Sequence, residues 1–157
     1  MAWLDEVKDP EVPVLSVVEL GVVRDAVVAA DGAVTVTVTP TYSGCPAMRV
    51  IEESIAEALR LRGVAQVTVR TVFTPAWTTD WIPEAARARL EVYGIAPPGP
   101  TEPSDELVPL RRATATLRCP WCKSTATSQT SEFGSTACKA LWHCSSCLQP
   151  FEAFKSI

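Results

Sequence analysis

Alternating hydrophobic and polar positions mark the strands in the first part of the chain. Residues 34–39 read VTVTVT, and this period of two predicts a half-buried strand. Residues 22–29 predict a preceding strand, and the dipeptide Asp31-Gly32 between the two is typical of a tight β-hairpin. We therefore expect an antiparallel pair over residues 22–39. The apolar stretch at residues 14–20 predicts a turn or two of helix that ends at Gly21.

Helical periodicity follows this hairpin. In residues 46–62 the side chains of Ile51, Ile55 and Leu59 recur every four positions and share one face of a predicted helix, which Gly63 ends. Residues 66–73 predict a third strand, which can pair in parallel because a helix connects it to the second. Residues 83–93 predict a second helix that ends at Gly94, with Tyr93 on its inner face.

A proline-rich segment divides the chain into two predicted domains. Residues 96–110 contain five of the thirteen prolines, which favours an extended linker. We expect an α+β domain over residues 1–95 and a ribbon domain over residues 111–157, with short strands at 113–117, 128–133, 140–143 and 151–154. The predicted fold class is α+β, a small mixed sheet with two main helices on one face, followed by a small all-β zinc ribbon.

Composition and charge narrow the classes of function. Apolar residues make up 47% of the chain and charged residues 20%, which is typical of a globular protein. The net charge of −4 disfavours partners such as nucleic acid or an anionic membrane. No apolar run is long enough to span a membrane, and the acidic N-terminus does not resemble a signal peptide. We therefore expect a cytoplasmic protein whose thiols are reduced.

Four of the six cysteines form two C-x₂-C pairs near the C-terminus. Cys119 and Cys122 are separated from Cys144 and Cys147 by 21 residues. Two such pairs on neighbouring turns close a tetrahedral four-sulfur site, which is typical of structural zinc. Iron also accepts four thiolates, so the spacing leaves zinc and iron open. A pair of redox dithiols is the weaker interpretation, because one C-x₂-C pair would suffice for that chemistry.

Two further residues accompany the four cysteines. Cys138 is a fifth thiol without a C-x₂-C partner, and it is either a buried apolar residue or an extra thiol that exchanges into the metal site. His143 adjoins Cys144 and is either a surface residue or a substitute ligand.

Cys45 is the only cysteine of the first domain. It precedes Pro46 at the predicted start of a helix, where backbone N–H groups and the helix dipole lower a thiol pKa. The hydroxyl groups of Thr41 and Ser43 are close enough in sequence to donate to the sulfur. The alternatives are a cap that happens to be cysteine or a buried thiol. The domain contains no histidine, which excludes a Cys–His catalytic pair.

Two carboxylates lie on a rigid segment near the N-terminus. Asp9 and Glu11 belong to the sequence DPEVP, in which two prolines restrict the backbone. Such a pair suits a cation or a hydrogen-bonded anchor, and an Asx-type turn is the alternative interpretation.

Three segments in residues 5–95 carry a family resemblance. DPEVPVLSVVELGVV, TPTYSGCPAMRVIEESI and TPAWTTDWIPEAARARLEVYGI resemble the domain shared by SufT and the eukaryotic cytosolic iron–sulfur targeting factor. The C-terminal SEFGSTACKALWHCSSCLQPFEAFK is similar to the tail of the PaaD family, accessory members of the phenylacetyl-CoA epoxidase group. Small departures from the family pattern are Lys123, at a usual glycine position, and Ile82-Pro83, at a Ser-type helix start.

This resemblance implies an accessory role rather than an enzyme. PaaD-like proteins are thought to support assembly of an epoxidase that has a di-iron site and a reductase with a [2Fe–2S] cluster. The implied partners are components of the epoxidase and iron–sulfur assembly proteins. Cys45 would be the functional thiol, a transient ligand for iron or an iron–sulfur cluster, and Asp9 and Glu11 the acidic pair beside it.

The same residues leave other functions open. A structural adaptor would dock on the oxygenase through the ribbon, with tryptophans as anchors or as core residues: Trp77, Trp81, Trp121 and Trp142. A nucleic-acid-binding ribbon is a third class, and the charge of the chain gives it little support.

Overall fold

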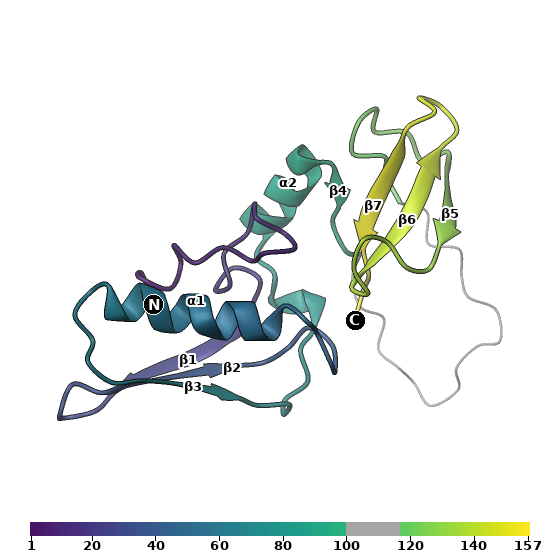
Figure 1. Cartoon of the computed structure of the whole chain (residues 1–157). Helices are drawn as coiled ribbons and strands as arrows, with labels where there is room; N and C mark the ends of the chain where they lie inside the picture. The colour runs from purple at the N-terminus through teal and green to yellow at the C-terminus, as the bar shows by residue number, and fades with distance from the viewer. Residues whose placement is uncertain (100–116) are drawn as a thin grey trace. The chain divides into compact units, whose positions relative to one another are not determined.

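The computed structural model describes residues 1–99 and 117–157. Within them the chain forms two compact units, Met1–Arg89 and Leu90–Ile157. The α+β fold class is confirmed, because the first unit combines a sheet with helix and the second is built from strands (Figure 1). From residue 100 on, the predicted linker lies outside the described residues, as does most of the strand expected at 113–117.

A three-stranded mixed sheet organises the first unit. Its strands are β1 (Val23–Val28), β2 (Val34–Val38) and β3 (Val67–Thr71), in the order β1-β2-β3. β1 and β2 form the expected antiparallel hairpin, and β2 and β3 pair in parallel. The hairpin turn needs Gly32, whose φ of +82° lies in the left-handed region.

Helix α1 (Met48–Arg60) lies along one face of this sheet (Figure 1). Its predicted apolar stripe is buried, and Ile55 has no exposed surface. The helix is shorter than the predicted 46–62 because residues 46 and 47 form a tight turn, in which the Met48 N–H donates to the Cys45 carbonyl. Gly63 (φ +88°) ends it with Schellman hydrogen bonds to the last-turn carbonyls.

The segment at residues 14–20 contains turns rather than the expected short helix. Ser16 and Glu19 form a capping box, in which each side chain accepts from the other residue's N–H at 3.0 Å. Gly21 then turns the chain at φ +75°, so only one α-type hydrogen bond forms, from the Leu20 N–H to the Ser16 carbonyl. The apolar side chains of this segment still enter the core.

A loop, a short 3₁₀ helix and the start of a second α-helix end the first unit, and the last four residues of that helix belong to the second unit. The 3₁₀ helix η1 spans Thr79–Trp81, and α2 spans Glu84–Tyr93. Trp77 is buried and donates its indole N–H to the Leu20 carbonyl at 2.9 Å. The expectation that Tyr93 faces inward is wrong: 53% of this last helical residue is exposed, whereas Leu90 is fully buried.

The second unit is a four-stranded sheet. Its strands are β4 (Ile95–Ala96), β5 (Thr127–Ser131), β6 (Lys139–Cys144) and β7 (Pro150–Phe154), in the order β4-β7-β6-β5. Three of them match predicted strands, and β4 is a strand that the sequence pattern does not predict. The core combines small, aromatic and sulfur side chains: Ala96, Cys119, Ala140, Trp142, Cys144, Phe151 and Ala153.

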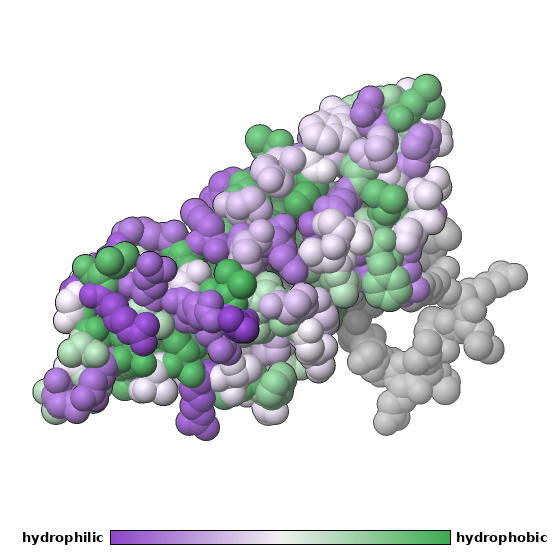
Figure 2. All heavy atoms as spheres, viewed as in Figure 1, coloured by the Kyte–Doolittle hydropathy of each residue, from purple (hydrophilic) through white to green (hydrophobic). Residues whose placement is uncertain are grey.

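No α-helix in residues 1–99 or 117–157 is long and apolar enough to cross a membrane. Hydrophilic and hydrophobic residues are mixed over the face of the molecule that Figure 2 shows.

Candidate metal centre and thiol site

The structure brings the sulfur atoms of Cys119, Cys122, Cys144 and Cys147 within 4.8 Å of one another. The Cys119–Cys147 sulfur distance is 3.7 Å and the Cys122–Cys144 distance is 3.5 Å. A tetrahedral ion with bonds of about 2.3 Å to sulfur sets its ligands about 3.8 Å apart, so these thiols fit one ion. An iron–sulfur cluster would bind the thiolates through different iron atoms and would hold them further apart.

The same backbone turn presents both cysteine pairs. In the first turn Lys123 N–H donates to the Cys119 carbonyl at 2.9 Å, and in the second Leu148 N–H donates to the Cys144 carbonyl at 2.9 Å. Lys123 (φ 63°) and Leu148 (φ 60°) both adopt the left-handed conformation. These are positions at which ribbon turns often use glycine, so each turn stores backbone strain that the metal-bound geometry must outweigh.

Backbone N–H groups stabilise the thiolate form of Cys144. The Cys147 N–H donates to the sulfur of Cys144 and lowers its pKa to about 6, and the Ser146 N–H acts in the same direction. The thiolate is the form that binds metal, so these N–H groups favour the ligand state at Cys144. At Cys147 the Gln149 N–H lowers the pKa, but burial and the three neighbouring cysteine sulfurs outweigh it and raise the pKa to about 12. The hydroxyl groups of Ser124 and Ser146 meet at 2.7 Å and link the two turns.

Cys138 and His143 lie outside this group of four. Cys138 is 3% exposed, and its sulfur lies 3.1 Å from the Thr136 hydroxyl. His143 is on β6 but does not belong to the ligand cluster found among the described residues.

Cys45 occupies a half-buried turn just before α1. Ala47 is the residue that caps the helix, and the Cys45 sulfur accepts hydrogen bonds from the Ala47 N–H and from Thr41. Burial raises the pKa of the Cys45 thiol above the ordinary value for cysteine, and the charges of Glu11 and Asp9 raise it further. The expectation of a lowered pKa is therefore wrong, because burial and two carboxylates outweigh the hydrogen bonds.

The acidic pair predicted at the N-terminus does approach this thiol. Asp9 is 5% exposed, and one of its oxygens accepts from the N–H groups of Glu11 (2.9 Å) and Val12 (2.8 Å), which forms the Asx-type turn. The turn thereby fixes the Asp9 carboxylate and the backbone of Glu11, and the charges of both residues act on Cys45. Ser43, in contrast, is exposed and is not among the groups that act on the thiol.

Cys45, Asp9 and Glu11 do not form a closed metal site. Among the described residues, the four ribbon cysteines are the only cluster of three or more potential ligand atoms within 4.8 Å of one another. An ion on Cys45 therefore needs ligands beyond these three side chains, and it would be held less firmly than an ion in the ribbon.

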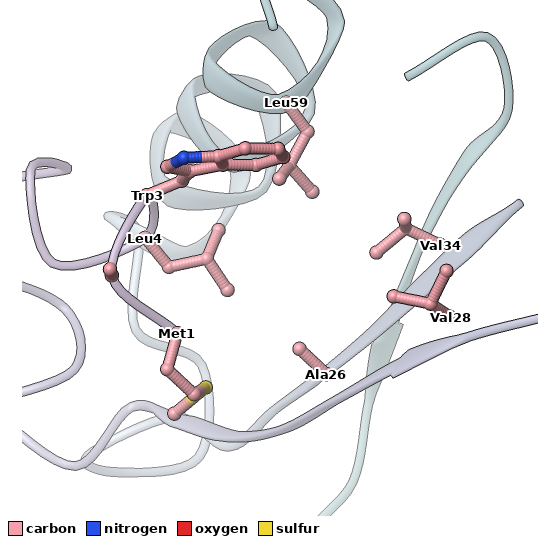
Figure 3. Close-up of a pocket in the computed structure, with 8 residues that line it drawn as sticks. Met1, Trp3, Leu4, Ala26, Val28, Val34 and Leu59 are labelled. Atoms are coloured by element: carbon pink, nitrogen blue, oxygen red, sulfur yellow. The ribbon is translucent and has the colours of Figure 1, made fainter. Parts of the chain in front are cut away.

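The first unit also contains an apolar cavity of about 300 Å³ (Figure 3). Its wall includes Trp3, Leu4 and Leu59, and the strands contribute Ala26, Val28 and Val34. Neither Cys45 nor a charged side chain lines it, so it is separate from both cysteine sites.

Two protein-family models match different parts of the chain. Residues 1–69 match the family described as iron-sulfur cluster assembly protein. Residues 103–155 match the family described as PaaD zinc beta ribbon domain.

Similar proteins cover either the whole chain or its first part. A relative from Escherichia coli, provisionally named as one of the subunits of 1,2-phenylacetyl-CoA epoxidase, is 46% identical over 99% of this chain and 90% of its own length. An Fe-S protein maturation auxiliary factor from Porphyromonas gingivalis is 40% identical over 55% of this chain and 83% of its own length.

A solved structure supports the fold of the first unit. It is the crystal structure of a domain of unknown function, DUF59, from Bacillus anthracis, with 28% identity and a TM-score of 0.54 over 58% of this chain and 87% of that chain. With the near full-length match to the Escherichia coli relative, these findings confirm the resemblance stated from the motifs. The chain belongs to the PaaD family, in which an iron–sulfur cluster assembly domain is followed by a zinc β-ribbon.

Proposed function

We propose that the protein is an accessory maturation factor of a phenylacetyl-CoA epoxidase, with Cys45 as a transient ligand for iron or an iron–sulfur cluster on its way to the epoxidase. The observation that carries this proposal is the Cys45 thiol beside the carboxylates of Asp9 and Glu11. The names of two relatives support the rest of the proposal. One is named as an epoxidase subunit, which suggests the partner, and the other as an Fe-S protein maturation factor, which suggests the process.

The charges around Cys45 favour a metal ligand over a nucleophile. With its pKa raised, the thiol is protonated at neutral pH and attacks an electrophile slowly. An iron cation removes this disadvantage, because it replaces the thiol proton and is attracted by both carboxylates. The site therefore suits a cationic cargo, and the protein acts as an accessory factor rather than as an enzyme.

The incomplete ligand set is consistent with transfer. One thiolate and two nearby carboxylates hold iron weakly, so a receiving protein with a full set of ligands can remove it. The ribbon has the opposite property, since its four cysteines surround one ion. We therefore assign a permanently bound structural zinc to the ribbon. At Cys45 we assign iron, or an iron–sulfur cluster, as a substrate that binds transiently and is transferred.

Complementation with matched cysteine variants tests this function. Cys45→Ala should yield an epoxidase with little iron and little activity, whereas Cys138→Ala, at a buried thiol outside the Cys45 site, should support normal maturation. Unchanged zinc content in both variants shows that the ribbon remains folded. A fully active, iron-loaded epoxidase assembled with Cys45→Ala would refute the proposal.

Exposed apolar side chains on the ribbon favour a structural adaptor as the second candidate. Trp121 is 53% exposed and Leu148 is 70% exposed, whereas Trp77 and Trp142 are buried and belong to the cores. An adaptor predicts that Trp121→Ala, measured with its ribbon saturated with zinc, loses binding to the epoxidase while Cys45→Ala retains full activity. The same complementation experiment therefore separates the two functions.

A further inference from the structure

The second compact unit, Leu90–Ile157, contains the zinc ribbon and is called the ribbon unit below. It includes the residues that follow α2, although the zinc-ribbon family match begins only at residue 103. Strand β4 adds to the ribbon sheet in parallel with β7, pairing Ile95 with Glu152 and Ala96 with Ala153. Ala96 is 1% exposed and shares the ribbon core with the ligands Cys119 and Cys144. The packing of this segment is thus continuous with that of the metal-binding cysteines.

Gly94 lies against the indole ring of Trp121 in the first cysteine turn. A Cβ atom at this position would lie 2.3 Å from the ring of Trp121, which stands between Cys119 and Cys122. The φ of Gly94 is +97°, a conformation that other residues adopt only with strain. A Cβ atom at this position would therefore force the indole to move, and the positive φ would add backbone strain.

An ion pair joins the same two parts of the ribbon unit. The Lys123 ammonium group donates to a Glu91 carboxylate oxygen at 2.8 Å and to the Pro120 carbonyl at 2.8 Å. Lys123 is the left-handed residue that closes the first cysteine turn. The position of this turn is therefore linked to the last turn of α2 by charge as well as by packing.

We propose that residues 90–96 and the four-cysteine metal centre form one cooperative unit, in which metal binding orders this segment against the ribbon and the docked segment raises the affinity for metal. The physical reason is linkage: a contact that exists only in the metal-competent fold stabilises bound metal by as much as metal stabilises the contact. Metal loading of the ribbon then controls the order of the segment that connects it to the rest of the chain. The inference requires that the four cysteines bind metal.

Amide hydrogen exchange on the full chain gives the first test. Peptides covering residues 90–99 should exchange much faster after zinc is removed by chelation, as should those covering β6 and β7. Peptides from α1 should exchange equally with and without zinc and serve as the internal reference. If zinc slows exchange in β6 and β7 but not in residues 90–99, the coupling is refuted.

Two glycines provide a matched pair for the second test. Gly63 and Gly94 both end α-helices with positive φ, at +88° and +97°, but nothing lies within 4 Å of a Cβ atom at Gly63. Gly63→Ala and Gly94→Ala therefore introduce the same kind of backbone strain, and only the second displaces Trp121.

Zinc affinity, measured by competition with a chromophoric chelator, should fall about 10- to 100-fold in Gly94→Ala and stay unchanged in Gly63→Ala. Trp121→Ala should show the same direction of change without altering the backbone. Equal affinities in all these variants would overturn the coupling. Failure of every variant and of the unmodified chain to bind zinc would instead overturn the premise that the cysteines bind metal. Hydrogen exchange on the unmodified chain remains decisive if Gly94→Ala does not fold.

Discussion

Removal of one sulfur ligand from the ribbon tests most directly how this small unit is stabilised. β6 offers two buried cysteines for comparison, because Cys138 immediately precedes the strand and Cys144 is its last residue. Only Cys144 belongs to the four-sulfur cluster. Cys138→Ser and Cys144→Ser therefore make the same chemical change at the two ends of one strand.

The expected magnitudes differ widely. Structural zinc contributes about 10–16 kcal/mol through four ligands, so one ligand accounts for about 2.5–4 kcal/mol. That loss corresponds to a fall in zinc affinity of roughly two to three powers of ten for Cys144→Ser. At Cys138 the new hydroxyl retains the Thr136 hydroxyl as a partner, so its burial costs about 1 kcal/mol and leaves the metal in place.

Zinc content after dialysis against a chelator and the tryptophan emission spectrum measure both effects. Cys144→Ser should lose zinc and expose Trp142, which stacks on Phe151 with ring centroids 6.5 Å apart in the folded ribbon. Cys138→Ser should retain both zinc and a buried Trp142. Retention of zinc by Cys144→Ser, or equal loss by both variants, would show that the ribbon is not held together by the metal at these four sulfurs.

Three further predictions follow from single contacts. Because the Cys45 thiol stays protonated up to its raised pKa, iron must displace one proton, so the affinity of this site for Fe²⁺ should rise about tenfold per pH unit between about pH 6 and 8. If the affinity for Fe²⁺ does not change with pH and is still lost in Cys45→Ala, then Cys45 binds iron without releasing a proton, and the thiol is not protonated in this pH range. Leu148→Gly should raise the unfolding free energy of the zinc-loaded ribbon by about 0.5–1 kcal/mol, because the relief of left-handed backbone strain exceeds the entropic cost of glycine. A lower denaturation midpoint in this variant would show that Leu148 is not strained. Trp77→Phe should cost the first unit about 1–3 kcal/mol in urea unfolding, because it leaves the Leu20 carbonyl buried without its donor, and an unchanged midpoint would exclude that role.

Local patterns were sufficient for most secondary structure and for finding the four cysteines whose sulfur atoms the structure brings together. Three predicted features depend only on residues that are close in sequence, and each appears in the fold as expected. They are the strand at residues 34–39, the hairpin turn at Asp31-Gly32 and the helix that ends at Gly63. The two C-x₂-C pairs are informative for the same reason, since each pair needs only its own turn to direct two sulfurs toward one point.

Properties that depend on distant residues were missed or reversed. The pKa of Cys45 rises because the fold brings burial, Glu11 and Asp9 to a thiol more than thirty positions away, whereas a local rule about helix ends predicts the opposite shift. Strand β4 is too short for any periodicity, and it exists only because β7 offers a free edge.

The physical reason for this division is the range of the forces. Side-chain periodicity, turn dihedrals and the spacing of chelating cysteines depend on residues a few positions apart, so they can be predicted from the sequence. Desolvation, charge–charge interaction and sheet pairing act through space, so their outcome for Cys45 and for residues 90–96 is set by which segments the fold places side by side.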